Sequence, residues 1–262
     1  MEVRSLYIYN MPYRKQQFVN GENYHIILRA IDNNLLFKDV NDYYRGIFSI
    51  YEFNTADPVE ILERRKIRAK IKKIIRNTGG PSSPEFSSEI VVSDLRDKLV
   101  KILAFCFMPN HIHLLLEQIK NNGITTFMRK VGTGLGGYFN KKYNREGHVF
   151  QSRFKDVHIK DEEQQKNAFV YIHTNPISLI EPKWKELGIK NLKKTIDFVE
   201  KYKWSSYLDY LGGKNFPSVT DRDSLLGLMG GVEGCRNFVN GWIEYKKELR
   251  EELNKFSDLP LD

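Results

Sequence analysis

The sequence has few cysteines, no long apolar run and no excess of acidic residues. Its only two cysteines, Cys106 and Cys235, are far apart and form no CxxC pair. This argues against a disulfide framework or a thiolate metal site, and it fits a reducing cytoplasm. No segment resembles a signal peptide or a transmembrane helix, so we expect a soluble, cytoplasmic protein with no membrane partner.

The charge balance favours a polyanionic partner. Lys and Arg total 41 against 33 Asp and Glu, which gives a formal net charge of +8. Nucleic acid is the leading candidate for such an excess, although a merely soluble basic protein would have the same composition. The hydrophobic content of 41% is enough to bury a real core, and it suggests one main domain with elaborations.

The pattern of apolar residues predicts alternating strands and helices. Two apolar runs flank a turn at Met108-Pro109-Asn110, which indicates an antiparallel hairpin, and the last helix is expected to end before Pro176. The expected elements are strands at 23–31, 98–107, 111–117 and 149–159, and helices at 39–53, 122–143 and 161–174.

This order matches an α+β fold of the ferredoxin-like split βαβ type, with one additional helix. Such a fold has an antiparallel sheet with helices on one face, and we expect the hairpin strands at its centre. A strongly basic, helical insertion occupies about 54–96 and contains a Gly- and Pro-rich connector at 79–84. We expect one domain over 1–195 and an appended helical C-terminal region over 196–262.

Two histidines at alternate positions follow the predicted turn. Alternate side chains of a strand point to the same face, so His111 and His113 project together. Two imidazoles at this spacing can share one metal ion. Two ordinary half-buried histidines would give the same pattern, so the pair alone leaves both interpretations open.

The predicted helix at 161–174 carries a second candidate set. Tyr171 and Asn175 are four residues apart, so they offer a hydroxyl and an amide oxygen on one helical face. Taken alone, the pair is better explained as a packing tyrosine and a helix-ending asparagine. Tyr138 is a weaker alternative, because Lys142 stands four residues later and cannot be a metal ligand while it is charged.

Other histidines are interpreted as ordinary. His25, His148 and His158 are given no special role. His173 is only two positions from Tyr171, so it points well away from it on a helix, which favours a structural or DNA-contacting role over metal binding.

Three motifs together resemble the HUH single-tyrosine transposases, specifically the REP-associated tyrosine transposases and their insertion-sequence relatives. The motifs are Met108-Pro109-Asn110-His111-Ile112-His113, Gly147-His148-Val149-Phe150-Gln151-Ser152-Arg153-Phe154 and Tyr171-Ile172-His173-Thr174-Asn175-Pro176. They occur in the family's order, and the resemblance covers roughly residues 10–180.

The resemblance implies a specific chemistry. His111, His113 and Asn175 would hold a divalent metal, typically Mg²⁺ or Mn²⁺, and Tyr171 would be the nucleophile on single-stranded DNA beside a hairpin. The product would be a 5′-phosphotyrosine with a free 3′-hydroxyl, as a strand transferase requires. Histidine ligands suit Mn²⁺ better than Mg²⁺, which leaves the physiological ion open.

Two other functions remain open. The fold could serve a catalytically silent DNA-binding protein, either a repressor or a structural factor, or a metal-dependent hydrolase in which water replaces Tyr171. Relatives also include domain-swapped dimers in which the catalytic helix serves the partner's histidines, so both a monomer and a homodimer are possible.

Basic residues in two segments are candidate DNA contacts. Their density in a basic protein favours contact with phosphates, and neighbouring aromatic rings could stack on unpaired bases, although a solvated helix face has the same composition. The candidates are Arg64, Arg65, Arg68, Lys72, Lys141, Lys142, Arg145, Arg153 and Lys155.

Overall fold

The computed structural model describes residues 17–60, 96–151 and 153–257, with isolated positions 63, 66, 69, 70 and 73 between the first two ranges. The predicted connector at 79–84 and four candidate DNA contacts, Arg64, Arg65, Arg68 and Lys72, lie outside the described residues. None of the helices in the described ranges combines the length and apolar character that crossing a membrane requires.

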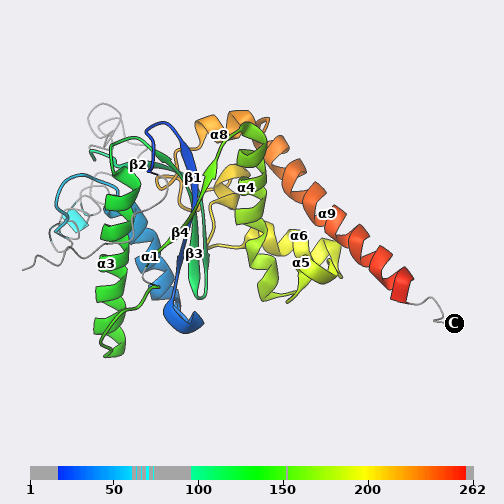
Figure 1. Ribbon diagram of the computed structural model, residues 1–262, viewed down its shortest axis with the longest axis horizontal. Coiled ribbons are helices and arrows are strands. Elements are labelled where there is room, and N and C mark those ends of the chain that lie inside the picture. Colours follow the sequence, from blue (N-terminus) through cyan, green and yellow to red (C-terminus); the bar gives the residue numbers. More distant parts are fainter. Residues whose placement is uncertain are drawn as a thin grey trace, which may run out of the picture.

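Four strands form one antiparallel sheet (Figure 1). They are β1 (Asn23–Arg29), β2 (Val100–Met108), β3 (His111–Gln118) and β4 (Lys155–Ile159), in the order β2-β3-β1-β4. Each neighbouring pair is antiparallel, which confirms the predicted hairpin and the α+β class.

The prediction that both hairpin strands are central is wrong for β2. Strands β3 and β1 occupy the centre, and β2 is at one end of the sheet. Residues of the C-terminal region cover its outer edge, because Phe107 N–H donates to the Trp204 carbonyl at 2.8 Å and Ser206 N–H donates to the Phe105 carbonyl at 3.0 Å. This cover explains why an edge strand has the apolar sequence of a central one.

The helices before and after the hairpin begin and end close to the predicted residues. They are α1 (Val40–Glu52), α3 (Gly123–Tyr143) and α4 (Glu162–Thr174). Asp39 caps α1 in a reciprocal capping box with Asp42, and the Asp161 side chain accepts from Gln164 N–H at the start of α4. The last strand is shorter than predicted: β4 begins at Lys155, and Phe150 forms only an isolated bridge with Ala30.

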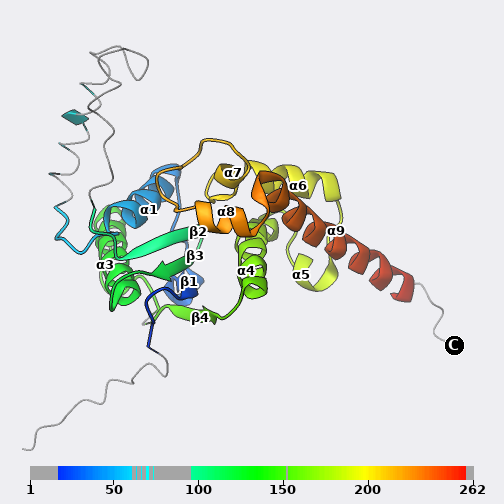
Figure 2. The same cartoon turned by 90° about the horizontal axis from the view of Figure 1, so that it is seen from above.

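The two faces of the sheet have different cores. Helices α1 and α3 lie on one face and α4 lies on the other, as the view from above shows (Figure 2). The central-strand residues in the α1 and α3 core are Tyr24, Ile26, Leu28, Ile112, Leu114 and Leu116. The alternate residues of β1 and β3, which face α4, include His25, Ile27, Arg29, His111, His113 and Leu115.

The C-terminal elements extend the second core. After a 3₁₀ turn (Asn175–Leu179) come α5 (Trp184–Leu187), α6 (Leu192–Lys201), α7 (Tyr207–Tyr210), α8 (Asp223–Leu228) and α9 (Gly231–Ser257). Helices α4 and α9 pack together, with Phe169, Tyr210 and Val239 buried between these elements and the sheet. Helix α6 spans position 195, so the domain boundary proposed there falls within a helix.

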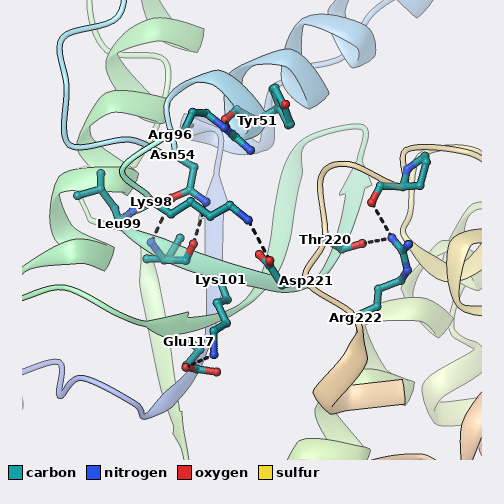
Figure 3. Close-up of polar contacts among 12 residues, drawn as sticks. Tyr51, Asn54, Arg96, Lys98, Leu99, Lys101, Glu117, Thr220, Asp221 and Arg222 are labelled. Carbon is teal, nitrogen blue, oxygen red and sulfur yellow. Dashed lines mark hydrogen bonds and ion pairs between the residues drawn. The ribbon is translucent and has the colours of Figure 1, made fainter. Parts of the chain in front are cut away.

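Polar contacts fasten the chain where the insertion leaves and rejoins the fold (Figure 3). The Asn54 side chain accepts from the N–H groups of Leu99 and Val100 at 3.1 Å each, and it donates to the Val100 carbonyl at 2.8 Å. Lys98 pairs with Asp221 at 2.9 Å. The start of β2 is therefore tied both to the end of α1 and to the C-terminal region.

Candidate active site

The histidine pair lies on the sheet face that α4 covers. The imidazole centroids of His111 and His113 are 4.7 Å apart, with the rings nearly perpendicular. His113 is buried and His111 is partly exposed. The prediction that both side chains project to one face is confirmed.

Each histidine has one nitrogen engaged and one available. His111 Nδ1 lies 2.6 Å from Asn110 Oδ1, and this oxygen can only accept, so the Nδ1 atom carries the proton. His113 Nδ1 lies 2.9 Å from His25 Nε2, and the buried Nε2 of His113 has no hydrogen-bond partner among the described residues. Metal-binding histidines are commonly oriented by a hydrogen bond from the other ring nitrogen, so both Nε2 atoms are suited to bind a metal.

The third histidine of the site is His25, which the sequence did not distinguish from an ordinary histidine. It lies on β1, beside β3, and its ring stacks on that of His113 with centroids 5.1 Å apart. The alternation of β1 placed His25 on the face opposite the apolar Tyr24 and Ile26. To connect it with His113, however, one must know that β1 pairs with β3.

Burial keeps the three histidines neutral. It lowers the pKa of His25 to about 4, and burial together with the positive charges of Arg29 and Lys185 lowers the pKa of His111 to about 4. The pKa of His113 is also well below its ordinary value, chiefly because of burial. Neutral imidazoles have free lone pairs, which metal coordination requires.

Helix α4 places Tyr171 against this cluster. Its ring stands edge-on to His113 with centroids 5.7 Å apart, and to His25 with centroids 5.6 Å apart. The residue is 40% exposed, so the ring packs on the histidines while part of the side chain stays open to solvent. Lys185 of α5 donates to the phenolic oxygen at 3.3 Å, and its Nζ lies 4.4 Å from the ring centroid.

Asn175 lies one turn beyond Tyr171, where α4 passes into the 3₁₀ turn. Its Nδ2 donates to the Tyr171 carbonyl at 2.8 Å, and the side chain is mostly buried. This bond leaves Oδ1, the atom that would bind a metal, without a hydrogen-bond partner among the described residues. Its role as a ligand stays a prediction.

The donor set fits a metal that keeps open positions. Among the described residues, no three His, Cys, Asp or Glu side chains are grouped as a complete metal site. Two imidazoles and one amide would hold an ion incompletely, so water or substrate oxygens must supply the other ligands.

Tyr138 lies elsewhere. It belongs to α3, on the opposite face of the sheet, and its hydroxyl donates to Asp42 Oδ1 at 3.0 Å. Lys142, a candidate DNA contact, forms ion pairs with Asp39 at 2.7 Å and Asp42 at 2.6 Å. Both residues thus belong to a polar cluster between α1 and α3.

The other described candidates for DNA contact come from the end of α3 and from β4 and the segment before it. Lys141, Arg153 and Lys155 are exposed, and Arg145 lies over the Phe139 ring at 5.6 Å. Lys155 of β4 lies opposite Ile27 of β1, so its side chain is on the same face of the sheet as the histidines. Their contacts with DNA stay predictions.

His173 points away from Tyr171, as its spacing predicted. It is fully buried, and its Nε2 lies 2.8 Å from Ser206 Oγ. It therefore has a structural role in linking α4 to the C-terminal region.

Residues 84–175 match the family described as "Transposase IS200 like", which confirms the resemblance drawn from the three motifs. Among solved structures, the chain is similar to a REP-associated tyrosine transposase bound to a REP hairpin, with 13% identity and a TM-score of 0.44. The similarity covers 81% of this chain and 96% of that one. The search of curated proteins found no match.

Proposed function

We propose that this chain, whose residues 84–175 match the IS200-like transposases, is a metal-dependent single-stranded DNA endonuclease and strand transferase. Tyr171 is the nucleophile, and His111, His113 and Asn175 are the metal ligands. The observation that carries the proposal is the contact of the Tyr171 ring with His113, at 5.7 Å between centroids. The proposed reaction needs a hydroxyl nucleophile close to two imidazoles that can bind a metal.

The residues have complementary roles in the proposed reaction. A divalent ion, when bound, withdraws charge from the phosphodiester and orients it for in-line attack. His25 holds His113 through their hydrogen bond, and Asn175 fixes the end of α4 through the Tyr171 carbonyl. The buried, neutral histidines keep their lone pairs available at neutral pH.

The bond changes explain strand transfer without ATP. The Tyr171 oxygen forms a bond to phosphorus, its proton passes to water, and the bond from phosphorus to the 3′-oxygen breaks. The leaving oxygen takes a proton and becomes a free 3′-hydroxyl. The 5′-phosphotyrosine retains the free energy of the phosphodiester, so another 3′-hydroxyl can reverse the step and join a new strand.

The packing of α4 supports a site whose protein residues all come from one chain. Helix α4 packs on the sheet that carries its own histidines, with Phe169 and Ile172 in the shared core. We therefore propose that a single chain suffices for cleavage, without exchange of α4 between two copies. Cleavage proportional to the first power of protein concentration would support this, and a second-order dependence would contradict it.

The proposal is tested with labelled single-stranded hairpin DNAs and Mn²⁺, followed by denaturing electrophoresis. Wild type should form a covalent adduct, Tyr171→Phe should form none, and the matched control Tyr138→Phe should retain it. His111→Ala should lose cleavage but keep most nonspecific DNA binding, because basic residues supply that affinity. Tight binding without an adduct would favour the silent binding protein, whereas cleavage without an adduct would favour the hydrolase.

A further inference from the structure

Two positive side chains flank the candidate site from different elements. Arg29 of β1 lies directly opposite His111 in the sheet and on the same face. Lys185 of α5 is 3.3 Å from the Tyr171 hydroxyl. Arg29 therefore lies beside a proposed metal ligand, and Lys185 lies beside the proposed nucleophile.

In the described part of the chain, no carboxylate forms an ion pair with Arg29 or Lys185. The predicted metal ligands are neutral as well. Protein sites that hold Mg²⁺ or Mn²⁺ tightly normally supply carboxylates, so this site has an excess of positive charge before any metal binds.

We propose that Arg29 and Lys185 form a phosphate-binding pair that holds the scissile phosphodiester beside Tyr171, and that this phosphate supplies the negative charge which metal binding requires. The inference rests on the proposed function. The Arg29 guanidinium can bind two phosphate oxygens at once, and the Lys185 ammonium can contact an oxygen next to the attacking hydroxyl.

The charge arrangement makes the binding of metal and DNA interdependent. In DNA-free protein, the two cations repel a divalent ion and the ion binds weakly. A bound phosphodiester attracts the metal and both side chains, so DNA tightens metal binding and metal tightens DNA binding by the same factor. Free metal consequently does not occupy the site permanently, and the site assembles on its substrate.

The test is a Mn²⁺ titration of full-length protein followed by electron paramagnetic resonance, with and without a single-stranded hairpin DNA. In wild type, DNA should tighten Mn²⁺ binding at least about tenfold. Without DNA, Lys185→Gln and Arg29→Gln should each bind Mn²⁺ about two- to tenfold more tightly than wild type, because a repelling charge is gone. With DNA, each variant should show less tightening than wild type.

Two matched variants control for trivial effects. Lys193→Gln removes the same charge from exposed helix α6 and should behave as wild type in both titrations. Lys185→Arg keeps the charge and should preserve the coupling. Thermal unfolding of each variant shows whether it folds, and Lys185 is exposed, so its replacement should leave stability almost unchanged.

The opposite signs of the two effects separate this inference from a loss of folding or of general DNA affinity. Unchanged or weaker Mn²⁺ binding by DNA-free Lys185→Gln and Arg29→Gln would overturn it, as would equal tightening by DNA in the variants and wild type. The proposed function fails by a different result, the absence of a covalent adduct on Tyr171. In wild type and Lys185→Gln, DNA should tighten Mn²⁺ binding to different extents. An uncharged methylphosphonate at the mapped cleavage position should abolish this difference in tightening, and a persisting difference would contradict the phosphate contact.

Discussion

Replacing His25 by Phe should weaken metal binding, although His25 is not one of the predicted metal ligands. His25 is 7% exposed, and its Nε2 is 2.9 Å from His113 Nδ1. Phe fills a similar volume but cannot hydrogen-bond, so His113 loses the partner that fixes its orientation. Loss of such an outer partner typically reduces metal affinity about 10- to 100-fold, equivalent to about 1.4 to 2.7 kcal/mol.

The change should also destabilise the fold. The buried Nδ1 of His113 is left without a partner, which costs about 1 to 3 kcal/mol. His25→Gln can restore a hydrogen bond and should recover part of both losses. The matched control is His158→Gln, because His158 lies on β4, stacks on Tyr24 on the other face of the sheet, and pairs with Glu22.

The assay combines Mn²⁺ titration by electron paramagnetic resonance with urea denaturation of the same proteins. The prediction is weaker Mn²⁺ binding in His25→Phe, partial recovery in His25→Gln and no change in His158→Gln. A Mn²⁺ affinity of folded His25→Phe equal to that of wild type would refute the reasoning, because His25 would then have no part in orienting His113.

Two further predictions concern stability. Gly134→Ala should destabilise the protein by about 1 to 3 kcal/mol, because a Cβ there would overlap the Phe53 ring. Gly132 of the same helix faces open space, so Gly132→Ala should stabilise the protein by up to about 1 kcal/mol. Chemical denaturation measures both free energies of unfolding, and equal effects would contradict the packing. Burial lowers the pKa of His173 to about 3, so the unfolded chain takes up a proton below pH 6.5 while the folded chain resists it. The stability that His173 contributes is therefore complete above pH 6.5 and is lost as the pH falls towards 3. His173→Gln should reduce the pH dependence of the unfolding free energy in that window by up to about 1.4 kcal/mol per pH unit. An unchanged slope in this variant would count against a neutral buried imidazole.

Local patterns predicted much of the fold and the centre of the site. The alternation in β3 placed His111 and His113 on one face, and the helical spacing separated Tyr171 from His173, as the structure confirms. These are contacts within one element or across a tight turn. Periodicity determines them without knowledge of the tertiary fold.

Contacts between distant segments could not be predicted in this way. The sequence of β2 is as apolar as that of a central strand, so it does not reveal that β2 is an edge strand. The segment with Trp204 and Ser206, about a hundred residues later in the chain, covers this edge. The role of His25 depends on strand order. Lys185 lies in a four-residue helix whose approach to Tyr171 depends on the path of the chain after α4, for which the sequence has no periodic signal.

The central claim is that Tyr171 becomes covalently joined to DNA, and peptide mapping tests it most directly. After reaction with single-stranded hairpin DNA and Mn²⁺, trypsin and nuclease digestion should leave a nucleotide on the peptide that spans residues 167–183, whose only tyrosine is Tyr171. The account predicts that mass spectrometry finds the nucleotide there, joined through a 5′-phosphate. A nucleotide on the peptide spanning 131–141, which contains Tyr138, or DNA cleavage with no nucleotide on any peptide, would contradict it.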